Sequence, residues 1–161
     1  MLLFKESKSL LHFLEKEKAE GKNIGFVPTM GALHEGHLSL IKLAKEKCDV
    51  VVCSIFVNPT QFNDAKDLEK YPRTPEKDLL LLNNAGCDVL YFPDKKDIYG
   101  EGEFQLKEYD FGNADKILEG KSRPGHFKGV ANVVRILLQN VQPDKLFLGQ
   151  KDFQQIGRAH V

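Results

Sequence analysis

The sequence predicts a three-layer α/β fold in which a parallel sheet lies between two layers of helices. Apolar segments of strand length alternate along the chain with segments of helical periodicity. One of them, DVVVCSIFV at residues 49–57, has no polar alternation, as expected of a strand covered on both faces. Polar clusters follow several of the predicted strands. Parallel strands joined by right-handed crossovers bring such clusters to one edge of the sheet, where ligands bind.

Length and composition favour one globular domain with no dominant charge. The chain has 161 residues, of which 42% are hydrophobic and 29% charged, close to the averages of globular proteins. Basic and acidic residues number 23 each, so no overall field attracts nucleic acid or an anionic membrane surface. We therefore expect neither a nucleic-acid nor a membrane partner, and any anion site must be local.

Cysteine usage and the N-terminus both indicate a cytoplasmic protein. The three cysteines, Cys48, Cys53 and Cys87, are an odd number without C-x-x-C spacing, which predicts reduced, buried thiols. The N-terminal segment MLLFKESKSLLHFLEKEK has charges between its apolar residues and no small-residue cleavage site, so it does not resemble a secretory signal.

The first predicted element is a surface helix at residues 7–20. Leu10, Leu11 and Leu14 form an apolar stripe among Lys and Glu residues, and Gly21 follows as a helix-terminating residue.

A short buried strand is predicted at residues 24–27, and a helix follows it after Pro28. The residues His37, Leu40, Ile41 and Ala44 recur at i, i+3, i+4 and i+7. This spacing predicts that His37 lies in the first turn, on the inner face of the helix.

After the strand at residues 49–57, a polar connection at 58–71 leads to a helix ending near Asn84. Thr74 and Pro75 suit its N-cap and first position, and Gly86 closes it. A strand is predicted at residues 89–92.

The remainder of the chain contains one long helix. Residues 95–112 are irregular, with a possible strand at 104–108 and no assigned topology. From Phe127 the apolar positions keep helical spacing until Pro143, and residues 145–148 predict one more short strand.

Three polar clusters are thereby predicted to share one edge of the sheet. They come after the strands at 24–27, 49–57 and 145–148. Their members are His34 and His37, then Asn58 and Gln61, then Gln150, Lys151 and Asp152.

The histidine cluster has the chemistry of a phosphate site. Gly31 and Gly36 flank His34 and His37, and glycine permits positive φ or a close approach of the backbone to a ligand. A helix N-terminus offers N–H groups to an anion, and imidazoles can donate to oxygens that gain charge. Zinc is the alternative for two histidines at i, i+3, but no further Cys/His pair stands at a suitable spacing.

The other motifs each allow two interpretations. NPTQF at residues 58–62 suits either a simple turn or two amides that bind a hydroxyl or carboxylate. Lys151 suits a solvated helix start or a phosphate contact, and Asp152 suits a helix cap or a ribose contact. RPGHF at residues 123–127 is either a plain loop or a source of a cation, Arg123, and a third histidine, His126.

Five segments together resemble the pantoate–β-alanine ligase family, also called pantothenate synthetases, in order and spacing. The resemblance covers nearly the whole chain and is far more specific than the H-x-G-H pattern alone. The segments are PTMGALHEGH (28–37), FVNPTQF (56–62), YPRTPEKD (71–78), LEGKSRPGHFKGVANVV (118–134) and GQKDFQQ (149–155).

The resemblance implies a Rossmann-like fold of the H-x-G-H nucleotidyltransferase type and a two-step ligase reaction. ATP and pantoate would give pantoyl adenylate and pyrophosphate, and β-alanine would then displace AMP to give pantothenate. Mg²⁺ would accompany the phosphates. A homodimer is also implied.

The resemblance also assigns residues to these roles. ATP would be held by Met30, Gly31, Ala32, Leu33, His34, Glu35, Gly36, His37, Gly149, Gln150, Lys151 and Asp152. His37 would donate a proton, with His34 and Lys151 as the other catalytic residues. Substrate would be bound by Gln61 and Gln155, with Asn58, Arg123 and His126 at further motif positions. Asp78 would lie near the magnesium, next to Lys77, where some relatives have a second acid.

The family continues beyond the motif at residues 149–155, whereas this sequence ends IGRAHV. We therefore expect residues 1–161 to be an N-terminal nucleotide-binding domain, incomplete and without the family's second basic loop and C-terminal domain. Two alternatives stay open: another H-x-G-H nucleotidylyltransferase, or an ATP-binding module without turnover. Gln61 together with Gln155 favours the ligase over the first of these.

Overall fold

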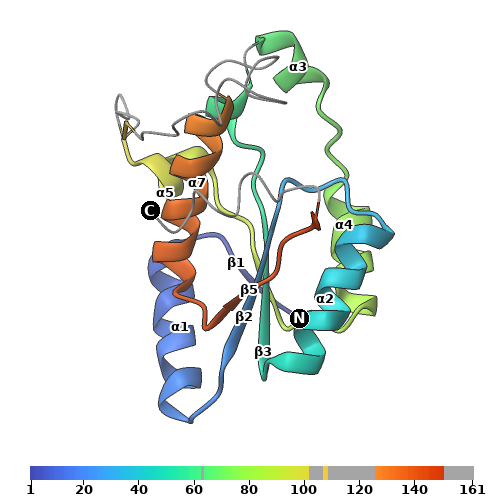
Figure 1. Ribbon diagram of the computed structural model, residues 1–161, viewed down its shortest axis with the longest axis vertical. Helices are drawn as coiled ribbons and strands as arrows, with labels where there is room; N and C mark the ends of the chain where they lie inside the picture. Colours follow the sequence, from blue (N-terminus) through green and yellow to red (C-terminus); the bar gives the residue numbers. More distant parts are fainter. Residues whose placement is uncertain (63, 102–106, 109–125, 151–161) are drawn as a thin grey trace.

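A parallel sheet forms the middle of the molecule. The computed structural model describes residues 1–62, 64–101, 107–108 and 126–150. Within them, five strands are hydrogen-bonded in the order β1-β4-β3-β2-β5, and every neighbouring pair is parallel (Figure 1). The strands are β1 (Leu2–Phe4), β2 (Ile24–Thr29), β3 (Val50–Ile55), β4 (Val89–Tyr91) and β5 (Lys145–Leu146).

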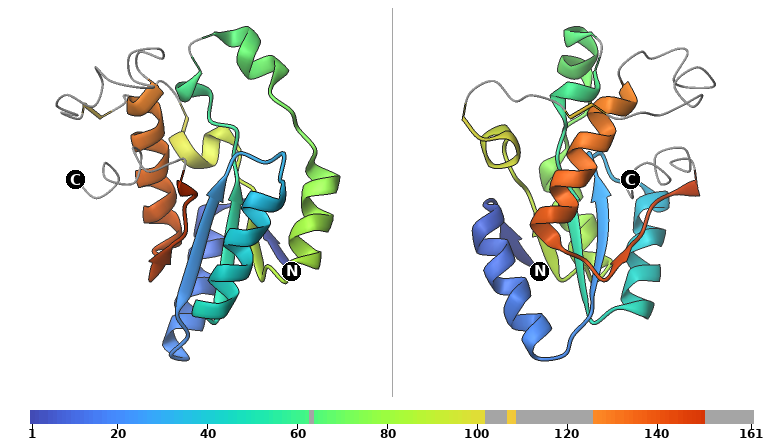
Figure 2. Two further views of the ribbon diagram at one scale, coloured as in Figure 1. Left: turned by 45° about the vertical axis from the view of Figure 1, so that its right-hand side comes forward. Right: turned by 60° about the vertical axis from the view of Figure 1, so that its left-hand side comes forward.

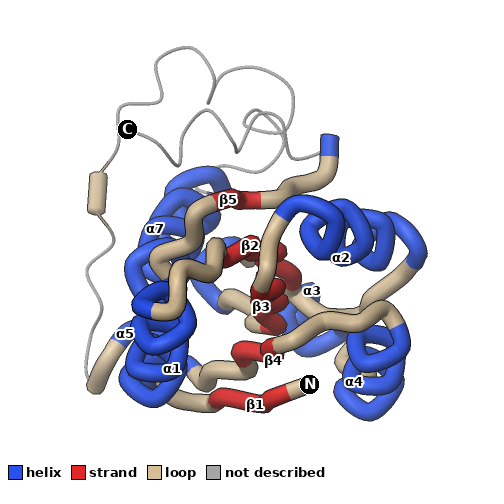
Figure 3. Tube along the Cα trace, turned by 90° about the horizontal axis from the view of Figure 1, so that it is seen from below, coloured by secondary structure: helices blue, strands red, loops and turns tan. Residues whose placement is uncertain are grey.

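Helices cover both faces of this sheet, which confirms the predicted three-layer fold. Figure 3 shows the layers end-on, with α1, α5 and α7 on one side and α2 and α4 on the other. A short 3-10 helix, η1, and helix α3 lie beyond the end of the sheet (Figure 2). The bounds are α1 (Ser7–Ala19), α2 (Glu35–Lys47), η1 (Pro59–Gln61), α3 (Ala65–Lys70), α4 (Pro75–Asn84), α5 (Lys95–Tyr99) and α7 (His126–Val141).

The central strand β3 has a buried side chain at each position, as its uninterrupted apolar sequence predicted. Because side chains alternate along a strand, Val50 and Val52 pack in the cluster beneath α1 and α7, whereas Val51 and Cys53 pack in the cluster beneath α2 and α4. The sheet therefore separates two cores, and both contribute to holding β2 and β3 side by side.

The inner face of α2 differs from the prediction. Its buried residues are Leu38, Ile41 and Ala44, whereas His37 is only half-buried. The helix is capped by His34, and the His37 ring turns back toward the backbone of that cap. His37 therefore lies in the first turn, as predicted, but it is not one of the residues of the buried inner face.

Four short elements were not predicted: β1, η1, α3 and α5. In β1, Leu2 and Leu3 are each 49% exposed, and the strand is held by pairing with β4, more than 80 residues later. Helix α5 is only five residues long and is capped by Asp94. Of the possible strand at residues 104–108, residues 104–106 lie outside the described residues.

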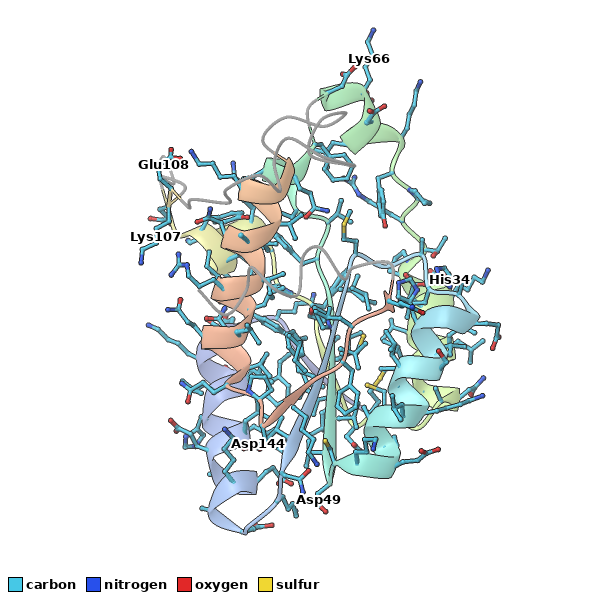
Figure 4. All side chains as sticks on the ribbon, viewed as in Figure 1. His34, Asp49, Lys66, Lys107, Glu108 and Asp144 are labelled. Carbon is cyan, nitrogen blue, oxygen red and sulfur yellow. The ribbon has the colours of Figure 1, made fainter. Side chains whose placement is uncertain are left out.

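Aspartates hold the strand starts at the edge of the sheet where the strands begin. The backbone N–H of Asn23 donates to Asp49 at 2.9 Å, and that of Ile24 donates to Asp144 at 2.7 Å. Figure 4 labels both aspartates toward the lower end of the molecule, whereas His34 lies at the upper end of α2. His34 and the start of α2 are therefore at the opposite, carboxyl edge of the sheet.

The three cysteines are free and buried, as predicted. Burial raises the pKa of the Cys87 thiol to about 11 and raises the pKa of Cys53 well above its ordinary value, so both thiols are neutral at physiological pH. Among the helices that the structure describes, none has both the length and the apolar character that a membrane span requires.

Candidate functional site

A cleft of about 890 Å³ opens at the carboxyl edge of the sheet. Its walls come from the segments after β2, β3 and β5 and from helices α2, α3 and α7. The lining residues are Pro28, Thr29, Met30, His34, Gly36, His37, Ser39, Leu40, Phe56, Gln61, Phe62, Asp67, Lys70, Tyr71, Pro72, Val130, Val133, Val134, Leu137, Leu148, Gly149 and Gln150.

The loop between β2 and α2 has a conformation that ordinary residues rarely adopt. Gly31 has φ +82° and Ala32 has φ +50°, both in the left-handed region. The backbone N–H of Gly31 donates to the Thr29 hydroxyl at 3.2 Å. Two successive positive φ values turn the chain sharply, so the histidines stand at the mouth of the cleft.

Asp78, on α4, holds this loop in place. Its two carboxylate oxygens accept from the backbone N–H groups of Ala32 at 3.0 Å and Leu33 at 2.8 Å. The Thr74 hydroxyl also donates to it at 3.2 Å. Asp78 is 1% exposed, so these donors replace the water that an ionised carboxylate requires.

These contacts bear on the predicted role of Asp78 near a metal. Both of its oxygens already accept hydrogen bonds from the protein, and the described residues contain no group of three His, Cys, Asp or Glu side chains that could hold a metal ion. The place of Asp78 near magnesium therefore stays a prediction, and what the described residues show is that Asp78 holds the loop after β2.

His34 and His37 form a coupled pair at the start of α2. Their ring centroids are 4.1 Å apart. Nδ1 of His34 accepts from the Gly36 N–H at 3.1 Å, and Nδ1 of His37 accepts from the His34 N–H at 3.4 Å. A ring nitrogen that accepts carries no proton, so each neutral imidazole has its proton on Nε2.

Gly36 is required by this arrangement, because a Cβ there would lie 2.9 Å from Cε1 of the His34 ring. Both rings line the cleft, and in each of them Nδ1 is the nitrogen that the helix start uses. Oxygens that carry negative charge are the partners that imidazole N–H donors suit.

The segment after β3 places Gln61 in the same cleft. Gln61 is 8% exposed, and its Nε2 donates to the Met30 sulfur. Asn58, by contrast, is 1% exposed and is not among the side chains that line the cleft. Its amide is bonded to the protein on both sides, including to Gln61. Asn58 therefore lies behind Gln61 as viewed from the cleft.

Helix α7 supplies an apolar wall opposite the histidines. Val130, Val133 and Leu137 are each under 9% exposed and line the cleft. The rim near α3 is aromatic and charged, with Phe62 and Tyr71 in an edge contact at 5.7 Å. The cleft therefore combines an apolar wall from α7 with the polar side chains of His34, His37 and Gln61.

The structure brings seven of the predicted site residues together at the cleft. Met30, His34, Gly36, His37, Gln61, Gly149 and Gln150 line the cleft. Leu33 instead packs in the core. The backbone N–H of Ala32 donates to the buried Asp78 carboxylate, and Glu35 is exposed in the first turn of α2. His126 begins α7, but its side chain is not described. Lys151, Asp152, Gln155 and Arg123 lie outside the described residues.

Sequence reasoning missed the α7 wall and the rim at α3. The long helix was interpreted as core, which is correct for most of its apolar face, and nothing in its periodicity separates a residue that lines a cleft from one that is fully covered. Asp78 was noticed only through the family resemblance, because its contacts reach a loop 45 residues away.

Comparison with known proteins identifies the family. The family model described as pantoate-β-alanine ligase matches residues 2–158. The chain belongs to the pantoate–β-alanine ligase family. A pantothenate synthetase of Porphyromonas gingivalis is 52% identical over 156 residues, covering 97% of this chain, and one of Aquifex aeolicus is 51% identical over 155 residues, covering 96%. The chain spans 55% and 54% of the lengths of these two ligases.

Solved structures of the ligase family have the same fold. The Francisella tularensis pantoate-β-alanine ligase, complexed with β,γ-ATP and β-alanine, superposes with a TM-score of 0.93 at 46% identity, covering 99% of this chain and 60% of that one. The pantothenate synthetase of Thermus thermophilus gives 0.89 at 41% identity, covering 99% and 56%. The Rossmann-like parallel sheet is therefore that of the ligase family.

Proposed function

We propose that this chain is the nucleotide-binding part of an ATP-dependent ligase that joins pantoate to β-alanine. In the first step a carboxylate oxygen of pantoate attacks the α-phosphorus of ATP, and pyrophosphate leaves. In the second step the amine of β-alanine attacks the acyl carbon, and AMP leaves as pantothenate forms. The observation that carries the proposal is the cleft, in which the histidine pair and Gln61 share one space.

The histidine side of the cleft suits the triphosphate. Negative charge grows on the departing pyrophosphate during adenylation, and the Nε2–H groups of His34 and His37 are fixed donors that can stabilise it. His37 serves in this proposal as the proton donor. Lys151 and Asp152, which follow the cleft residues Gly149 and Gln150 in sequence, complete the ATP set by family resemblance.

The Gln61 side of the cleft suits pantoate. An amide donor binds a carboxylate or hydroxyl oxygen without placing a full positive charge beside it. Holding pantoate there would make its attack on ATP effectively intramolecular, which removes much of the entropic barrier. Gln155, Arg123 and His126 stay predicted substrate residues on the basis of the resemblance.

Magnesium enters the proposal only as the ion that accompanies ATP, where it would neutralise phosphate charge. The described residues provide no ligand set for it, and no step here depends on one. We further propose a cytoplasmic homodimer. The three free thiols are consistent with a reducing compartment, and sedimentation analysis would measure the subunit number.

The test is an assay of the 161-residue chain for exchange of labelled pyrophosphate into ATP. The proposal expects exchange that requires pantoate, and AMP release that additionally requires β-alanine. Exchange with a different acceptor and none with pantoate would favour another H-x-G-H nucleotidylyltransferase. ATP binding by calorimetry without any exchange would identify a binding module, the alternative that the 55% coverage of the P. gingivalis relative keeps open.

A further inference from the structure

Asn58 is a fully engaged amide at the junction of three elements. It is 1% exposed and precedes η1. Its Oδ1 accepts from the Thr60 N–H at 3.2 Å and from the Tyr99 hydroxyl at 2.5 Å. Its Nδ2 donates to the Gly129 carbonyl at 3.2 Å and to Oε1 of Gln61 at 3.3 Å. The side chain thus joins η1, α5 and α7.

Two backbone groups fix which way this amide faces. The Thr60 N–H can only donate, so the Asn58 atom beside it must be the oxygen. The Gly129 carbonyl can only accept, so the atom beside it must be the nitrogen. A reversed Asn58 amide would set a donor against a donor and an acceptor against an acceptor, which is costly in a buried site.

The orientation of Asn58 determines that of Gln61. Because the nitrogen of Asn58 faces Gln61, the Gln61 atom that meets it must be the acceptor, Oε1. Nε2 of Gln61 is then on the other side, where it contacts the Met30 sulfur at the cleft. The Gly129 carbonyl of α7 thus fixes the orientation of the Asn58 amide, and Asn58 in turn fixes the orientation of the Gln61 amide at the cleft.

The first turn of α7 packs so closely on η1 that this chain has little freedom. A Cβ added at Gly129 would lie 2.9 Å from the Cα of Gln61 and closer still to the Thr60 carbonyl. Figure 1 shows the segment after β3 running beside the upper end of α7, and the two elements are in contact. The backbone groups that orient Asn58 are thereby held at fixed positions.

We infer that Asn58 is a positioning residue that keeps the Gln61 amide nitrogen directed at the cleft, so that this subsite selects a ligand oxygen that accepts hydrogen bonds. The inference rests on the proposed function for the identity of that ligand, the carboxylate or hydroxyl oxygens of pantoate. It assigns Asn58 no direct contact with substrate, in contrast to the role predicted from the family resemblance.

The ligand-free protein provides a test that does not depend on the proposed function. With the Gln61 side-chain amide assigned by NMR, we expect nuclear Overhauser contacts between its NH₂ protons and the Met30 methyl group. The Asn58→Asp variant at pH 8 replaces the Asn58 donor by an acceptor of the same shape, so the Gln61 amide should reverse and these contacts should disappear. Contacts retained at full strength in Asn58→Asp would overturn the inference.

Binding measurements then connect the orientation to the ligand. Asn58→Asp and Gln61→Glu should each weaken pantoate binding by about tenfold or more, with ATP affinity changed by less than about twofold. Tyr99→Phe is the matched control, since it removes one donor to Asn58 but leaves the Thr60 N–H, and its pantoate affinity should be close to that of the wild type. Equal losses of ATP and pantoate affinity in Asn58→Asp would show a merely structural role and contradict the inference.

Should Asn58→Asp not fold, Gln61→Glu and the wild-type Overhauser contacts still decide the question. Absence of those contacts in the wild type would refute the fixed orientation. If wild-type protein shows the contacts but does not bind pantoate, the proposed substrate is wrong while the positioning role of Asn58 stands.

Discussion

The two imidazoles at the cleft are held by the helix that they begin. Each Nδ1 accepts a backbone N–H at the start of α2, which leaves Nε2 as the proton carrier in both rings. A histidine in this tautomer donates without needing to be charged, so the pair can serve phosphate oxygens at neutral pH. The sequence pattern indicated imidazoles near a helix start, but only the geometry identifies the donating nitrogen.

Replacing His37 by Ala tests this donor. We expect the rate of pantoate-dependent pyrophosphate exchange to fall by about 10²- to 10³-fold, the usual loss for one fixed donor to developing charge. The free energy of unfolding should change by only about 1 kcal/mol or less, because His37 is half-buried. Lys42→Ala, on the exposed side of the same helix, is the control and should leave the exchange rate unchanged. An unchanged rate in His37→Ala would exclude it as a donor.

Asp78→Asn tests the carboxylate that holds the loop. Asparagine offers one acceptor and one donor where two backbone N–H groups now meet two acceptors. We expect the free energy of unfolding to fall by about 1–3 kcal/mol and ATP affinity to fall with it, measured by urea denaturation and calorimetry. Glu76→Gln, exposed in the first turn of α4, should change neither. Wild-type ATP affinity in Asp78→Asn would show that the loop keeps its conformation without this carboxylate.

Among the secondary-structure elements, those with a strong local pattern were predicted well. Helices α1, α4 and α7 and the strands β2, β3 and β4 lie within about two residues of their predicted bounds. Their periodicity, caps and uninterrupted apolar runs are local signals. The elements that were missed, β1, η1, α3 and α5, have three to six residues each, and too few positions to establish a period.

Gly129→Ala tests the close packing of α7 on η1. Alanine favours a helix over glycine by about 1 kcal/mol, yet the added Cβ would overlap the Thr60 carbonyl. We expect a net loss of about 1–3 kcal/mol, typical of overpacking, together with weaker pantoate binding because the Gln61 segment must shift. The control is Gln139→Ala on the exposed face of α7, which should stay within about 0.5 kcal/mol of the wild type. A more stable Gly129→Ala protein would contradict the packing.

For the whole molecule, the predicted convergence of polar clusters at one edge is seen for His34, His37, Gln61 and Gln150, which line one cleft, while Lys151 and Asp152 lie outside the described residues. It followed from the parallel arrangement of strands, a property of topology rather than of any one residue. The sequence did not predict which buried residues hold the site from behind. Asp78 and Asn58 act through contacts with segments 45 and 71 residues away in the chain, and no local pattern encodes such pairs.

The burial of Cys87 in one of the two cores makes the stability of the fold depend on pH in the alkaline range. The unfolded thiol ionises near its ordinary pKa of about 8.5, whereas burial raises the pKa of Cys87 in the fold to about 11. Between these values the unfolded state binds fewer protons, so stability falls as pH rises. We expect Cys87 to account for a loss of about 2–3 kcal/mol between about pH 8 and 11.

Urea unfolding at several pH values, comparing the wild type with Cys87→Ala, would isolate this contribution. The variant removes the ionising group, so the difference in unfolding free energy between the two proteins should shrink as the pH rises. A difference that stays constant across this alkaline range would show that the Cys87 thiol is not protected in the fold.

The strand order β1-β4-β3-β2-β5 also governs the order in which the molecule can assemble. The neighbouring strands β2 and β3 are separated by one helix, so their pairing closes a short loop, whereas β1 must wait for β4 and β5 must return to β2 from more than 110 residues away. Long loop closures are slow and entropically costly. On the ribosome, the histidine loop would therefore be bordered by its β3 partner early, while the cleft would gain its α7 wall only after His126–Val141 has been synthesised.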